Sequence, residues 1–165
     1  MRTRIQLLTV AFVMALAMMV PSATFAETVW VDGNKVALGG YDVVAYHTTH
    51  MATRGSKEHS TKLNEVTLYF ASKENLALFE KSPHKYLPQY GGYCSFGVGK
   101  FNVKAYSDPR TFKIHNGKLH LFYNDFHKGK VLNAIVPWNQ YENKLVAKAD
   151  LNWAKIKWDE VKGFK

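Results

Sequence analysis

The sequence predicts an α+β domain, in which a small antiparallel sheet built from hairpins carries helices on one side. Three segments support this fold class. Residues 66–70 alternate apolar and polar side chains, residues 111–123 form two strands around Asn116-Gly117, and residues 138–156 repeat apolar side chains at the spacing of an amphipathic helix. No repeat or flexible linker divides residues 27–165, so we expect one domain with a C-terminal helical extension.

The first 26 residues are typical of a secretory signal peptide. Arg2 and Arg4 precede an apolar run from Leu7 to Val20, and Thr24-Phe25-Ala26 places small residues before a cleavage site. The sequence therefore predicts a periplasmic or secreted protein that is cleaved after Ala26. An uncleaved membrane anchor is the alternative, but this run of 14 residues is shorter than the ~20 that a span needs.

The first elements of the mature chain are short. Residues 29–38 are expected to form a small hairpin in which the Asp32-Gly33 pair supplies the positive φ of the turn. Residues 41–47 predict a short extended or mixed segment, and the polar residues 50–60 predict a loop. Residues 66–70 then have the period of a half-buried strand.

A helix is expected to follow that strand. Ser72 is a good N-cap and Glu74 suits the positive end of the helix, while Leu76 and Phe79 share one face. Pro83 ends it. Residues 88–100 then hold four glycines among aromatic residues, which indicates tight turns or close backbone contacts.

The hairpin of residues 111–123 has a predictable register. A two-residue turn pairs Lys113 with His120, so His115 and His120 share one face with two lysines. We expect that face to be solvated, with weak anion contact as the alternative, and too positive to bind a metal. The core face is expected to hold Phe112, Ile114, Leu119, Leu121 and Tyr123.

The last third predicts an amphipathic helix. Pro137 is expected to start it and Asp150 to interrupt it. Its apolar positions are Trp138, Tyr141, Leu145, Ala149, Trp153 and Ile156.

Three stretches of the chain carry a family resemblance: Gly39 to Tyr46, Tyr69 to Ser72, and Pro83 to Cys94, which includes Tyr90-Gly91-Gly92-Tyr93. Together they resemble the YHS domain family, and in particular its exported single-domain members. The likeness covers roughly residues 38–158.

The resemblance also implies a loss. Metal-associated relatives carry cysteines at three positions that correspond to Ala45, Ala71 and Asn75 here. An alanine methyl group cannot ligate a metal, so the resemblance implies the fold without the family's thiolate site. A metal-binding role must therefore rest on other residues.

Composition excludes several classes of protein. The 165 residues include 14% aromatic side chains, which is too many for a disordered chain, and a single cysteine, which excludes an internal disulfide and a multi-cysteine metal knuckle. The chain after Ala26 has 20 basic and 13 acidic groups, a net charge of +7 with neutral histidines.

Cys94 is the first candidate for chemistry, with three open interpretations. It could be a buried core residue among Tyr90, Tyr93 and Phe96, a soft-metal ligand, or a reactive thiol in the first turn of a short helix. His47 and His50 lie three residues apart and would complete a His-His-Cys set suited to copper or zinc, with His59 as a weaker fourth ligand. The first hypothesis is thus an exported, non-catalytic protein that handles copper or another soft metal ion.

The alternative hypothesis needs no metal. Tyr41, Tyr46, Tyr90 and Tyr93 would line an aromatic cleft for a small ligand or a protein partner. The sequence has no phosphate loop, no His-Glu-x-x-His and no nucleophile elbow, so we expect no enzyme, a thiol enzyme through Cys94 being the remaining alternative. Asp42 is expected to bond backbone in a turn rather than to act as a base.

The C-terminal lysines suggest a surface contact. They could touch anionic membrane headgroups or acidic polymers, a plainly solvated helix face being the alternative. No nucleic-acid recognition motif is present, and an exported protein fits such a partner poorly. These lysines are Lys144, Lys148, Lys155, Lys157, Lys162 and Lys165.

Overall fold

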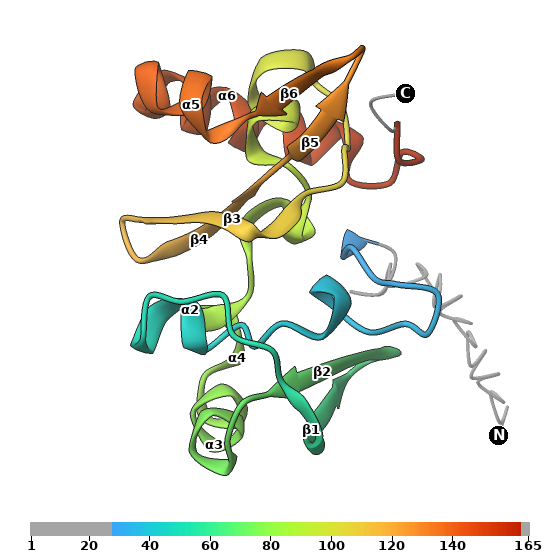
Figure 1. Ribbon diagram of the computed structural model, residues 1–165, viewed down its shortest axis with the longest axis vertical. Helices are drawn as coiled ribbons and strands as arrows, with labels where there is room; N and C mark the ends of the chain where they lie inside the picture. The colour runs from blue at the N-terminus through green and yellow to red at the C-terminus, as the bar shows by residue number, and fades with distance from the viewer. Residues whose placement is uncertain (1–27, 163–165) are drawn as a thin grey trace, which may run out of the picture.

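The computed structural model describes residues 28–162, and within them the chain is a mixed α+β protein (Figure 1). The predicted signal peptide lies outside these residues. The described strands form three separate antiparallel pairs, whereas the sequence predicted a single small sheet. The pairs are β1 (Ser56–Leu63) with β2 (Val66–Phe70), β3 (Asp108–His115) with β4 (Lys118–Phe122), and β5 (Asn124–His127) with β6 (Lys130–Asn133).

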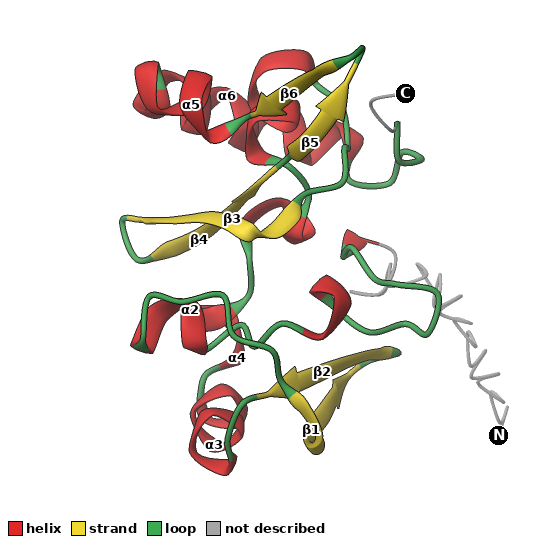
Figure 2. Cartoon of the chain, viewed as in Figure 1, coloured by secondary structure: helices red, strands yellow, loops and turns green. Residues whose placement is uncertain are grey.

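The hairpin β3–β4 crosses the middle of the molecule, between two groups of elements (Figures 1 and 2). On one side lie β1, β2 and the helices α2 (Ala45–Thr48), α3 (Lys73–Lys81) and α4 (Pro83–Tyr86). On the other lie β5, β6, α5 (Ile135–Gln140) and α6 (Glu142–Ile156). Short helical turns connect them: η1 (Leu38–Gly40), η2 (Gln89–Gly92) and the π-helix η3 (Gly97–Phe101). Among residues 28–162, no helix has the length and apolar character that crossing a membrane requires.

The strand and helix predicted around Ser72 are confirmed. Val66, Leu68 and Phe70 are buried and their neighbours half-buried, the alternation expected of β2. The Ser72 hydroxyl accepts a hydrogen bond from the Asn75 N–H at 3.2 Å and caps α3, which ends before Pro83. Sequence and structure agree here because the determinants lie within a few residues of each other.

Two N-terminal predictions are wrong. Residues 56–60 are not a loop but the first half of β1, whose side chains are mostly exposed and so show no apolar period. In the turn of residues 32–36, the positive φ belongs to Lys35 rather than Gly33, because the Asp32 carboxylate accepts the N–H groups of Asn34 and Val36. Val31 and Ala37 form one isolated bridge across that turn instead of a longer hairpin, and Val36 bridges to Thr67 of β2.

The predicted register of β3–β4 is confirmed, with Lys113 opposite His120 and His115 opposite Lys118. The predicted exposure of His120 is wrong. Leu119 and Leu121 enter the core on the β1–β2 side, whereas Phe122 enters a second core with Trp138, so both faces of β4 are covered. His120 lies on the second face and is only 1% exposed.

The C-terminal helix is split. Helix α5 begins at Ile135, before Pro137, and Tyr141 breaks the helical path with φ −137° before α6 starts. Tyr141 is exposed instead of packing in the core, and Asp150 does not interrupt α6. The hairpin β5–β6 was not predicted, because its turn depends on the positive φ of Lys128 and Gly129.

Candidate functional site

Cys94 is a core residue. It is fully buried among Phe96, Phe122 and Trp138, and its Sγ accepts a hydrogen bond from the Gly97 N–H at 3.4 Å. Burial raises the pKa of the Cys94 thiol, and hydrogen bonds from neighbouring backbone only partly oppose it. This placement matches the first of the three interpretations, a neutral thiol that packs like a small apolar side chain.

The structure does not bring the predicted metal ligands together. His47 lies on α2, with its ring against Tyr86 at 5.4 Å between centroids, and His50 is exposed after that helix. Cys94 lies in the core on the α5–α6 side of β3–β4. Within residues 28–162, no group of three or more His, Cys, Asp or Glu side chains is arranged to hold a metal ion, and this covers the half-buried His59 as well.

One carboxylate, that of the buried Asp42, contacts all three positions at which the YHS resemblance implies cysteine: Ala45, Ala71 and Asn75. Asp42 Oδ1 accepts the Ala45 N–H at 3.2 Å, and Oδ2 accepts the Ala71 N–H at 2.8 Å and the Asn75 side-chain amide at 2.6 Å. Oδ1 also accepts the Val44 N–H at 2.8 Å. Asp42 thus accepts hydrogen bonds from backbone N–H groups, as predicted. A cluster centred on this aspartate lies where the resemblance implies a thiolate site.

The four predicted cleft tyrosines do not line a common cleft. Tyr46 is buried and donates its hydroxyl to the Pro109 carbonyl at 2.8 Å, while Tyr41 packs under Arg54 at a separate surface hollow. Tyr93 is buried beside Lys104, and burial raises its pKa to about 12. Of the four tyrosines, Tyr90 alone lines the hollow that contains the buried His120.

We call this hollow the His120 pocket. It has a volume of about 110 Å³ and lies between η2, the β3–β4 hairpin and α6. Its walls are Gln89, Tyr90, His115, Asn116, Lys118, His120, Val146 and Asp150.

His120 forms the buried floor of the pocket. Its Nδ1 lies 3.1 Å from the Ser95 hydroxyl, and its ring packs against Tyr90 at 5.7 Å and Trp138 at 5.5 Å. Its Nε2 is buried and has no hydrogen-bond partner among the described residues. Burial, with the nearby His115 adding to it, lowers the pKa of His120 to about 4, so the ring is neutral at pH 7.

Tyr90 adopts an unusual backbone conformation at the pocket wall. Its φ of +53° lies in the left-handed region, which costs an aromatic residue on the order of 1–3 kcal/mol. The Tyr90 hydroxyl donates a hydrogen bond to Asp150 Oδ1 at 2.9 Å. Burial raises the pKa of Tyr90, and this hydrogen bond raises it further. The following Gly91 also has positive φ, and a Cβ there would lie 1.8 Å from the Thr28 carbonyl oxygen. This strained turn holds the Tyr90 ring against His120.

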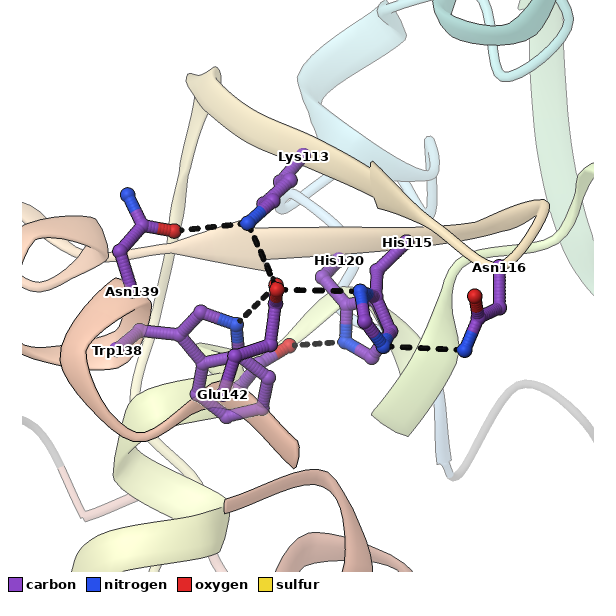
Figure 3. A network of polar contacts seen from close by, with 8 residues as sticks. Lys113, His115, Asn116, His120, Trp138, Asn139 and Glu142 are labelled. Carbon is purple, nitrogen blue, oxygen red and sulfur yellow. Dashed lines mark hydrogen bonds and ion pairs between the residues drawn. The ribbon is translucent and has the colours of Figure 1, made fainter. Parts of the chain in front are cut away.

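A polar network fixes the other wall of the pocket (Figure 3). The Glu142 carboxylate lies 2.8 Å from Lys113 Nζ and 3.2 Å from His115 Nδ1, and it accepts the Trp138 indole N–H at 3.1 Å. Burial opposes ionisation of Glu142, but the hydrogen bonds from Lys113 and Trp138 outweigh it and lower its pKa. His115 is therefore held in place at the pocket rim, and is half-buried rather than solvated as predicted.

A larger hollow adjoins the His120 pocket. This Tyr90 cleft has a volume of about 480 Å³ and shares Gln89, Tyr90 and Asp150 with the pocket. Leu87, Pro88 and Trp153 supply apolar wall, while Asn64 and His84 add polar groups. Together the two hollows offer a small polar end and a wider, partly aromatic body.

The burial of Cys94 predicts resistance to alkylation. In the folded protein we expect iodoacetamide to leave Cys94 unmodified, because the thiol is enclosed and its pKa is raised. The same reagent should label it fully in concentrated urea, which serves as the control. Mass spectrometry measures both, and equal labelling rates in the two conditions would contradict the core placement.

Comparison with known proteins adds no relative: no family model, no curated protein and no solved structure matches the chain. The resemblance to the YHS domain family therefore stays a prediction from the sequence motifs.

Proposed function

We propose that this chain is a non-catalytic binding domain for a small organic ligand, whose polar end occupies the His120 pocket and whose body lies in the Tyr90 cleft. The observation that carries the proposal is the His120 Nε2 atom, which is buried at a pocket yet has no hydrogen-bond partner among residues 28–162. Leaving such an atom unsatisfied costs about 1–3 kcal/mol, which a ligand group would relieve.

The dimensions define the ligand class. At roughly 30 Å³ per water, 110 Å³ admits about four non-hydrogen atoms, the size of an amide or carboxyl group. The cleft, at about 480 Å³, lies within the range of small-molecule sites. A neutral imidazole presents one N–H and one bare nitrogen, so Nε2 can form a hydrogen bond with either type of group.

The proposal assigns binding rather than catalysis because burial weakens His120, the buried histidine of the pocket, as a base. A histidine with a pKa of about 4 is a poor proton acceptor at pH 7, and Tyr90 and Cys94 are held in their neutral forms. Export and membership of the YHS family belong to the same proposal. Their support is the N-terminal sequence and the convergence of Ala45, Ala71 and Asn75 on Asp42.

The test is nitrogen NMR of the histidine rings during titration with benzamide. We expect the His120 Nε2 resonance to move on binding and a His120→Gln variant to lose saturable binding. His47 provides an internal control. Its Nε2 is likewise buried without a hydrogen-bond partner in the described part of the chain, but His47 lines neither of the two hollows. If neither benzamide nor benzoate moves the His120 resonance relative to that of His47, the proposal is wrong.

The metal hypothesis is tested on the same protein. We expect neither Cu⁺ nor Zn²⁺ to raise the melting temperature, because Cys94 is enclosed in one core whereas His47 packs against Tyr86 of the other. A stoichiometric metal ligand would raise it by mass action. A rise that Cys94→Ser abolishes would support copper or zinc binding through Cys94, His47 and His50, and would count against the pocket.

A further inference from the structure

Another hollow lies between η3 and α6 and shares no residue with the His120 pocket or with the Tyr90 cleft. We call it the lysine hollow, with a volume of about 270 Å³. Its apolar walls include Phe96, Tyr141 and Leu145, and its basic groups are Lys100, Lys144 and Lys148.

The apolar floor of the lysine hollow belongs to the core. Phe96 and Leu145 pack in that core and are 8% and 5% exposed. Phe101 packs edge-on against the Phe96 ring at 5.6 Å. Tyr141, at the break between α5 and α6, is 61% exposed and leaves much of its surface open to a ligand.

The three lysines concentrate positive charge at this hollow. Lys144 and Lys148 lie four residues apart on α6, a spacing at which like charges destabilise a helix. None of the three lysines forms an ion pair within residues 28–162, and no carboxylate lines the hollow. The acidic residues of α6 are engaged elsewhere, Glu142 with Lys113 and Asp150 with Tyr90. The lysine hollow therefore carries positive charge that no carboxylate in its walls neutralises.

We propose that the lysine hollow binds a single-chain anionic amphiphile, with the anionic head among Lys100, Lys144 and Lys148 and the chain on Phe96, Tyr141 and Leu145. The volume equals that of about nine waters at roughly 30 Å³ each, which suits a carboxylate with a chain of about eight carbons. A single chain fits the recessed apolar base, which the flat surface of a bilayer would not reach.

Calorimetric titration of the purified chain with octanoate tests the site. We expect one molecule to bind, and the variant K144E/K148E to lose affinity by about tenfold or more. The matched control is K57E/K62E, which makes the same charge change at exposed positions of β1. Equal loss in both variants would mean that net charge alone attracts octanoate, and would overturn the site.

The apolar contribution has its own variant. Tyr141→Ala should weaken octanoate binding several-fold, whereas Phe126→Ala, at an equally exposed aromatic residue of β5, should leave it unchanged. Acetate and octyltrimethylammonium should bind much more weakly, since each lacks half of the recognised chemistry. If either compound bound as tightly as octanoate, the proposal would be overturned. Binding to phosphatidylglycerol vesicles without binding of octanoate would also overturn it, and would assign the lysines to contact with a membrane surface.

Discussion

Asp42→Ala is expected to destabilise the protein by about 3–5 kcal/mol, because several N–H donors lose their acceptor at about 1–3 kcal/mol for each buried one. Asp42 is fully buried, and its two oxygens accept four hydrogen bonds from Val44, Ala45, Ala71 and Asn75. Alanine leaves the buried N–H groups of Val44 and Ala45 without this acceptor, together with the part-buried donors of Ala71 and Asn75. Urea-induced unfolding followed by circular dichroism measures the change.

Two further variants make the Asp42 result specific. Asp42→Asn keeps one carbonyl oxygen and should lose less stability than alanine. Asp32→Ala is the matched control, because Asp32 also accepts two backbone N–H groups in a turn but lies at the surface, where about 0.5–1 kcal/mol is expected. If both alanine variants cost the same, the convergence at Asp42 contributes nothing beyond an ordinary turn.

Acidification is expected to remove about 3 kcal/mol of stability through His120 alone. The pKa of His120 falls from 6.5 to about 4 on folding, chiefly because the ring is buried. Below pH ~6.5 the unfolded chain takes up a proton that the folded chain does not, so stability is complete above that pH and falls until about pH 4. Free energies of unfolding between about pH 7 and pH 4 measure this slope.

The His120→Gln variant isolates this effect from other titrating groups. Glutamine does not titrate, so its stability curve should be flatter than that of the natural chain over this pH range. His47, whose pKa burial also lowers, contributes to both curves and cancels in the difference. Parallel curves would contradict the burial of a neutral ring at position 120.

The parts of the fold that the sequence predicted correctly depend on neighbouring residues. Asn116-Gly117 sets the β3–β4 register and Ser72 starts α3, each through contacts within a few positions. Strand β1 was missed because its pairing with β2 forms it, without an apolar pattern of its own.

The candidate site was harder to predict because its parts are distant in sequence. Ser95 and His120 are 25 residues apart, and Tyr90 and Asp150 are 60 apart. The hairpin register did place His120 opposite the apolar face of β4. No local pattern reveals that Trp138 and α6 cover the face on which His120 lies. This packing buries His120 at the floor of a pocket.

The double burial of β4 has a consequence for cooperativity. Leu121 and Phe122 are adjacent in the chain but pack into different cores, so one strand is structurally part of both. If either half of the molecule unfolded, β4 would lose the packing on one of its faces, and its packing against the other half would weaken. We therefore expect the two halves to unfold together, so that the hollows on the α6 side share the stability of the distant β1–β2 end.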